Sequence, residues 1–309
     1  MWQPFQFFYD AIREDFGYPV TLLRLINKNP NINIPITAPE QVINAHSVMQ
    51  WQNFCGHPLI QTSKAGTLTG WRYCAGHYES FQQHLPEIEN FCRCEIIKNW
   101  SCDIQDVVGL SASKSDLDKF TSLDRMVENN SKEMIETITE ENLRKNLAHD
   151  QIRIFKENSV DYFSIYMWDG RTFLINHGGS HHFAAARYIA SRIGRKVPLR
   201  GKLYTYSIDA LAVHALQQKF DIYSISGSEM YMDFFEAMRN VRGTFLEYPL
   251  PRPYTHASAI LLPKNAPRTA RISHALKKYG VFDLGEHLTH LITLQNDHRR
   301  KLHSLSKHA

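Results

Sequence analysis

The chain has 309 residues, of which 43% are hydrophobic, and 35 Lys and Arg against 31 Asp and Glu give a formal net charge of +4. This length allows one large domain or two ordinary ones, and no apolar run approaches the roughly 18 residues of a membrane span, so no membrane partner is expected. The start of the chain lacks a basic region followed by an apolar stretch, and five cysteines are an odd number for a disulfide framework. We therefore expect a cytoplasmic protein, and its weak basic bias permits a nucleic-acid partner without requiring one.

Two helices are predicted before residue 55. Phe5 to Phe16 is rich in aromatic residues with amphipathic spacing, and Gly17 ends it. Glu40 to Phe54 places Val42, Ala45 and Met49 on successive turns, which predicts a second helix with a buried face.

All five cysteines fall between residues 55 and 102, and several have a histidine or another cysteine two or three positions away. Short steps of this kind place two ligands on one edge of a tetrahedral zinc ion, although the spacing is not that of a common zinc finger. Buried free thiols and surface histidines are the ordinary alternative. The candidate ligands of a structural Zn²⁺ are Cys55, His57, Cys74, His77, Cys92 and Cys94.

The segment from Ser111 to Glu141 is polar and charged, with apolar residues every three or four positions. This pattern predicts one or two surface helices that connect the cysteine-containing region to a central hairpin. Thr139 has the character of an N-cap, with Glu140 and Glu141 in the first turn of the next helix.

The central stretch predicts a hairpin, a glycine loop and a helix. Tyr162 to Trp168 and Arg171 to Asn176 have strand character, and Asp169-Gly170 between them is typical of a two-residue type I′ turn. After the glycines, Phe183, Ala186 and Ala190 recur at helical spacing.

The loop His177-Gly178-Gly179-Ser180-His181-His182 thus lies between a strand and a helix, where free N–H groups and the helix dipole favour anions, above all phosphates. Such junctions are common, and glycines often serve only the turn. The functional interpretation gives catalytic roles to His177, Ser180, His181 and His182, and cofactor binding to Asn176, Gly178, Gly179 and Ser180. The candidate carboxylates for an accompanying Mg²⁺ are Glu141, Asp161 and Asp169.

The segment GGSHHFAAARYIA, from Gly178 to Ala190, resembles the signature of the ParB/sulfiredoxin superfamily. In that family a strand leads into a Gly-x-His-Arg type loop and an Ala-Ala helix, and the loop holds nucleotide phosphates. Sulfiredoxins carry Gly-Gly-Cys-His-Arg at these positions. Here Ser180 replaces the reactive cysteine, which argues against sulfinic acid reduction, and His182 replaces the arginine. The resemblance covers Glu140 to Tyr206.

The remaining elements alternate between strands and helices. Strands are expected at 199–206, 221–225 and 257–262, and helices after a Ser207 cap, along 231–238, 269–279 and 284–305. Tyr248 to Tyr254 must be extended, because three prolines lie within five residues.

Together these elements predict an α/β (α+β) protein with a small mixed sheet, a hairpin and glycine loop before a helix, and several packed helices. Three regions are expected: a Cys/His-containing helical region (1–115), a ParB/sulfiredoxin-like core (116–215) and a C-terminal α/β and helical region (216–309). The sequence favours a nucleotide-binding protein, with Mg²⁺, that hydrolyses nucleotides or transfers a phosphoryl group. It leaves open a metal-dependent nuclease that uses the histidine cluster, and a non-catalytic module that binds nucleic acid or protein.

Overall fold

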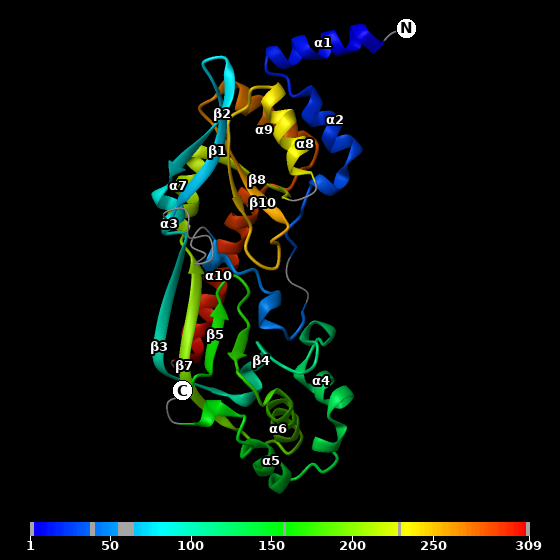
Figure 1. The fold of residues 1–309 in the computed structure, drawn as a ribbon. Coiled ribbons are helices and arrows are strands. Elements are labelled where there is room, and N and C mark those ends of the chain that lie inside the picture. The colour runs from blue at the N-terminus through cyan, green and yellow to red at the C-terminus, as the bar shows by residue number, and fades with distance from the viewer. Residues whose placement is uncertain (1–2, 38–40, 55–64, 157–158, 228–229, 307–309) are drawn as a thin grey trace. The chain divides into compact units, whose positions relative to one another are not determined.

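In the computed structural model, residues 3–37, 41–54, 65–156, 159–227 and 230–306 are described. They form an α+β protein with two five-stranded sheets, as expected from the sequence (Figure 1). The chain divides into two compact units. The first unit comprises Met1–Thr37, Gln50–Cys92 and Ile208–Thr293, and the second comprises Ala38–Met49, Arg93–Ser207 and Leu294–Ala309. Both units are discontinuous in sequence, whereas the three expected regions are consecutive.

The first unit contains an antiparallel sheet of order β2-β1-β9-β10-β8. Its strands are β1 (Thr67–Cys74), β2 (His77–His84), β8 (Phe220–Ser226), β9 (Phe245–Pro249) and β10 (Ala257–Pro263). Its helices are α1 (Gln3–Asp15), α2 (Val20–Lys28), α3 (Pro86–Glu89), α7 (Ala210–Lys219), α8 (Tyr231–Asn240), α9 (Pro267–Lys278) and the first half of α10 (Leu284–Ser306). Buried side chains of α2, α8 and α9 share one hydrophobic cluster with β8, β9 and β10.

The second unit contains a mixed sheet of order β3-β7-β5-β6-β4. Its strands are β3 (Cys92–Asp103), β4 (Val107–Leu110), β5 (Tyr162–Tyr166), β6 (Thr172–Ile175) and β7 (Pro198–Ile208). Strand β6 runs antiparallel to β5 and parallel to β4, and β5 runs parallel to β7. The helices are α4 (Leu123–Asn130), α5 (Glu140–Leu147), α6 (Ser180–Arg192) and the second half of α10. Helices α4 and α5 both pack against α6 (Figure 1).

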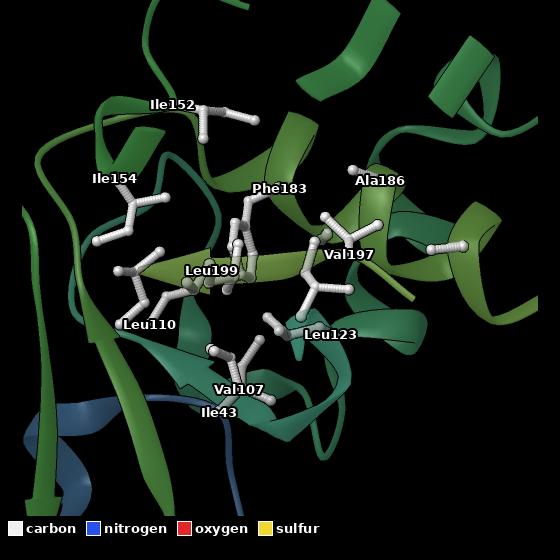
Figure 2. Packing of buried hydrophobic residues seen from close by; sticks show 14 of the residues in the cluster. Ile43, Val107, Leu110, Leu123, Ile152, Ile154, Phe183, Ala186, Val197 and Leu199 are labelled. Carbon is white, nitrogen blue, oxygen red and sulfur yellow. The ribbon is translucent and has the colours of Figure 1, made fainter. Parts of the chain in front are cut away.

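The core of the second unit is organised around α6. Phe183, Ala186 and Ala190, which predicted this helix by their spacing, are at most 1% exposed. Figure 2 shows Phe183 among Ile152, Val197 and Leu199, in a cluster that these residues share with the sheet. Burial of a phenylalanine side chain contributes roughly 1.5–3 kcal/mol, so the first turn of α6 is fixed in place by its own core residue.

The predicted helix from Glu40 to Phe54 is wrong. Within its described residues the structure has only the short 3₁₀ turns Ala45–Ser47 and Trp51–Asn53. The apolar side chains are buried as expected, but the backbone bonds elsewhere: Ile43 N–H donates to Phe120 O, and Leu110 N–H donates to Ile43 O. The apolar residues of this segment recur at helical spacing because an extended chain is buried on several sides, and not because it is a helix.

Three further local predictions need correction. The hairpin between β5 and β6 has a five-residue connection, residues 167–171, in which Gly170 has φ +82° and Asp169 does not have positive φ, so it is not a type I′ turn. Helix α7 is capped by Asp209, whose Oδ1 accepts from Leu211 N–H at 2.8 Å, and not by Ser207. Residues 67–103, in the region expected to be helical, form β1, β2 and β3 apart from the short α3. The predicted cap Thr139 is confirmed, since its Oγ1 accepts from Asn142 N–H at 3.2 Å.

Candidate functional site

The candidate site lies where the loops after β4 and β6 meet. Because these two strands are adjacent and parallel, their carboxyl ends lie at the same edge of the sheet. Residues 111–115 follow β4 and residues 176–180 follow β6. Segments that are more than 60 residues apart in the chain are thereby brought together.

Asn176 joins the two loops. Its Oδ1 accepts from Ser111 N–H at 3.2 Å and from Ala112 N–H at 3.1 Å, and its Nδ2 donates to Ala112 O at 2.9 Å and to Gly178 O at 3.0 Å. The side chain is 3% exposed and its polar atoms are fully used. Asn176 was predicted to bind a cofactor, but this geometry makes it the support of the loops, outside the pocket lining.

Gly179 is the N-cap of α6, with φ +68°, and it offers no side chain to cap the helix. The first intrahelical bond joins Phe183 N–H to Gly179 O at 2.9 Å. The N–H groups of Ser180, His181 and His182 have no acceptor within the described part of the chain. Three donors and the positive end of the helix dipole are therefore left for an anion.

These groups line a pocket of about 800 Å³. All residues around it belong to the second unit: Ala112, Ser113, Lys114, Ser115, Asn130, Ser131, Glu133, Met134, His149, Gln151, Arg153, His177, Gly178, Gly179, Ser180, His181 and His182. The glycine loop and the start of α6 form one side of the pocket, and the rest comes from residues 112–115 after β4, from the end of α4 and from the segments that follow α4 and α5.

His181 is held by two serines. Its Nε2 is 3.1 Å from Ser115 Oγ, and its Nδ1 forms a hydrogen bond with Ser131 Oγ. Burial lowers the pKa of His181, and the charge of Lys114 acts in the same direction while Glu133 opposes it. A neutral imidazole that donates one bond and accepts the other fits these contacts. His181 thus positions Ser115 and Ser131, and both its ring nitrogens are engaged.

His182 stacks on His149, with ring centroids 3.6 Å apart and an angle of 16° between the planes. Its Nδ1 is 2.9 Å from Asn146 Oδ1. Burial lowers the pKa of His182, and the electrostatic interaction with His149 acts in the same direction, so the neutral form of His182 is favoured in this stack.

His177 has a different environment. Its backbone N–H and its Nδ1 both lie 3.0 Å from Asp161 Oδ1. The Asp161 side chain is 1% exposed, whereas the His177 side chain is 51% exposed and lines the pocket. A buried carboxylate that accepts from Nδ1–H leaves the Nε2 lone pair available, and Nε2 has no partner among the residues that the structure describes.

The pocket also carries formal charges. Lys114 and Arg153 line it and form no ion pair with another described residue. Among the lining residues that the structure describes, Glu133 is the one carboxylate. Of the carboxylates expected from the sequence, Asp161 lies behind His177, Asp169 pairs with Arg171 at 2.8 Å, and Glu141 is outside the lining.

The predicted zinc ligands are only partly described. Cys74 and His77 face each other across the β1–β2 hairpin, and Cys92 and Cys94 lie in β3, whereas Cys55 and His57 lie outside the described residues. Within the described ranges, no group of three or more His, Cys, Asp or Glu side chains could share a metal ion. Zinc binding by these residues stays a prediction.

Sequence reasoning identified the glycine loop but missed the opposite walls of the pocket. Ser113, Lys114 and Ser115 follow β4, and Ser131 and Arg153 come from the ends of helical segments. One local signal was present: the run Ser111-Ala-Ser-Lys-Ser115 directly after an apolar strand, rich in hydroxyl groups and containing a lysine.

Comparisons with known proteins identify a family but no activity. A family model described as a family of unknown function (DUF6685) matches residues 97–301. No curated protein and no solved structure matches the chain. Among the described residues, no helix has both the length and the apolar character needed to cross a membrane.

Proposed function

This chain belongs to the DUF6685 family of unknown function, and we propose that its pocket at the start of α6 binds a nucleotide through the phosphate groups. The observation that carries this proposal is the uncapped N-terminus of α6. There the N–H groups of Ser180, His181 and His182 lack an acceptor in the described structure, and these three residues line the pocket. Helix N-termini of this kind bind phosphate through directed hydrogen bonds and the helix dipole.

The surrounding side chains suit the same ligand. Lys114 and Arg153 provide positive charge, and Arg153 can bind two phosphate oxygens at once. Hydroxyl groups of Ser113 and Ser115 lie beside the helix terminus. An anion in this position would be contacted by N–H, O–H and cationic donors from several segments.

The size of the pocket supports a nucleotide over a free phosphate. Its volume of about 800 Å³ lies within the range of typical small-molecule sites and leaves room for a base and a sugar. The resemblance to the ParB/sulfiredoxin superfamily, in which this loop holds nucleotide phosphates, supports the same assignment.

A Mg²⁺ ion is compatible with these residues. Such ions are commonly held by one or two carboxylates together with substrate phosphates. Glu133 is the carboxylate in the lining that would serve, with the ligand phosphates providing the other oxygens.

Calorimetric titration with the four ribonucleoside triphosphates in Mg²⁺ tests the proposal, with nucleosides and inorganic phosphate as comparison ligands. We expect triphosphates to bind and nucleosides not to bind. Arg153→Ala should weaken binding about tenfold, the size of a charge-assisted hydrogen bond. Lys196, an exposed lysine in the same unit, provides the control variant Lys196→Ala, whose affinity should be unchanged. Absence of triphosphate binding, or full affinity in Lys114→Ala/Arg153→Ala, would contradict the proposal.

A further inference from the structure

We propose that His177 is the general base that activates water for attack on the bound phosphate, and that Asp161 positions it. This inference rests on the proposed function and adds a reaction, hydrolysis, to the binding site. It assigns separate roles to the three histidines of the loop.

The contacts with Asp161 fix the orientation of the His177 ring. Asp161 Oδ1 lies 3.0 Å from the backbone nitrogen and 3.0 Å from the Nδ1 of the same residue, so both the main chain and the ring of His177 are held by one buried oxygen. A carboxylate can only accept these bonds, which places the ring proton on Nδ1. The lone pair of Nε2 is then free to accept a proton, on a side chain that lines the pocket.

His181 does not have this freedom, and His182, although its Nε2 has no partner among the described residues, has no carboxylate behind its Nδ1. Both nitrogens of His181 are bonded to serine hydroxyls, and His182 is stacked on His149 and bonded to Asn146. Of the three, His177 alone pairs with a buried carboxylate, which can stabilise the imidazolium that forms when a proton is taken up.

Water is a better candidate nucleophile than Ser180. The Ser180 side chain is buried, and its Oγ donates to Ser113 Oγ at 2.9 Å. No described base contacts this hydroxyl. His177 lines the pocket and its side chain is half exposed, so water has access to the imidazole.

In the proposed step, Nε2 takes a proton from water as the water oxygen forms a bond to the terminal phosphorus. The bond between that phosphorus and the bridging oxygen breaks, and its electron pair stays on the leaving nucleoside diphosphate. The N–H groups at the start of α6 contact the charge on the transferred phosphoryl group. The imidazolium then releases its proton to solvent, and the products are inorganic phosphate and the diphosphate.

The test measures phosphate release and nucleotide affinity on the same variants. His177→Ala removes the base from a half-exposed position and should lower turnover at least about 100-fold, the lower range for general base catalysis, while changing affinity less than about threefold. Added imidazole should restore part of the turnover. His214→Ala, at an exposed histidine of α7, is the matched control and should keep wild-type turnover.

Asp161→Asn tests the positioning role. Turnover should fall without a matching loss of affinity, and the double variant His177→Ala/Asp161→Asn should be no slower than His177→Ala alone, because Asp161 acts through His177. An additional loss in the double variant would assign Asp161 a separate role and overturn this part of the inference. Circular dichroism checks that each variant is folded.

The remaining outcomes separate the two proposals. A wild-type protein that binds triphosphates but releases no phosphate, or a His177→Ala variant that keeps full turnover, overturns the general-base inference and leaves nucleotide binding intact. A wild-type protein that binds no nucleotide overturns both.

Discussion

The carbonyl oxygen of Gln151 lies so close to Gly179 that a Cβ added to the glycine would be 2.7 Å from it. Gly179 is therefore required by the neighbouring backbone, which approaches it from the segment after α5. The contact ties the N-terminus of α6 to the wall of the pocket, and it makes substitution of Gly179 a perturbation of the fold before it is a test of ligand binding.

A matched pair of glycines separates the cost of a left-handed backbone from the cost of the clash with Gln151. Gly179 and Gly194 lie at opposite ends of α6 with φ of +68° and +65°, but a Cβ on Gly194 would meet nothing within 4 Å. We expect Gly194→Ala to lower the free energy of unfolding by about 1–2 kcal/mol, the cost of left-handed backbone, and Gly179→Ala by about 3 kcal/mol or more, because of the added clash. Urea denaturation of both variants measures the difference. Equal losses would show that the Gln151 contact relaxes freely.

Asn176→Ala should be among the most destabilising polar substitutions in the second unit. It removes the side-chain partner of Ala112 N–H and of the carbonyl groups of Ala112 and Gly178, whereas Ser111 N–H keeps its bond to Leu174 O, and we expect a loss of about 3 kcal/mol. Asn129→Ala is the control, because Asn129 is exposed and donates one bond to Arg125 O; it should cost less than about 0.5 kcal/mol. Urea midpoints of the two variants provide the comparison. A similar loss in both would refute the loop-joining role.

Stability should fall in mild acid because of His287 in α10. Burial lowers the pKa of His287 from 6.5 to about 4, and the charge of His290 acts in the same direction. Between these two values the unfolded chain binds a proton that the folded chain does not. The free energy of unfolding therefore decreases as pH falls from 6.5 towards 4, by an amount on the order of 2 kcal/mol from this residue after allowance for solvent screening.

The measurement is urea denaturation at pH 7 and at pH 5 for wild type and His287→Gln. The variant should lose less stability between the two pH values than wild type does. His214→Gln, at an exposed position, controls for the loss of a histidine. If His287→Gln follows the wild-type curve, the acid sensitivity comes from other groups.

Glu133 should affect anion binding in opposite ways with and without a divalent ion. Without metal its negative charge repels phosphate across the pocket, so Glu133→Gln should tighten inorganic phosphate binding about two- to fivefold in the presence of a chelator. With Mg²⁺ and a triphosphate the same substitution should weaken binding, because a ligand oxygen loses its charge. Titrations under the two conditions measure this change of sign. A uniform effect would remove Glu133 from the metal-binding role.

The glycine loop and helix α6 could be predicted because the residues that determine them are close together in the sequence. Phe183, Ala186 and Ala190 are buried on one side of α6, so their spacing alone indicated a helix after the glycines. The strands β2 and β3 were missed for the opposite reason, since most of their side chains are exposed or only half-buried and no apolar alternation marks them.

The rest of the pocket depends on contacts that no local pattern contains. Lys114 lies in the pocket because β4, a strand of four residues, pairs in parallel with β6. The hydrogen bonds by which Asn176 connects the two loops depend on the same pairing, because its partners Ser111 and Ala112 follow β4. His177 and Asp161 are 16 residues apart, and their contact requires the β5–β6 hairpin to return the chain to its starting edge.

The parallel pairing of β4 and β6 also divides the pocket lining into two parts that the chain holds in place in different ways. A parallel pair requires a long crossover, and here it runs from residue 111 to residue 171 and includes α4 and α5. The loop after each strand is fixed by sheet register, whereas residues 130–134 and 149–153 of the crossover form the outer wall. Insertions in the crossover can therefore reshape that wall while the loops after β4 and β6 keep their places at the edge of the sheet.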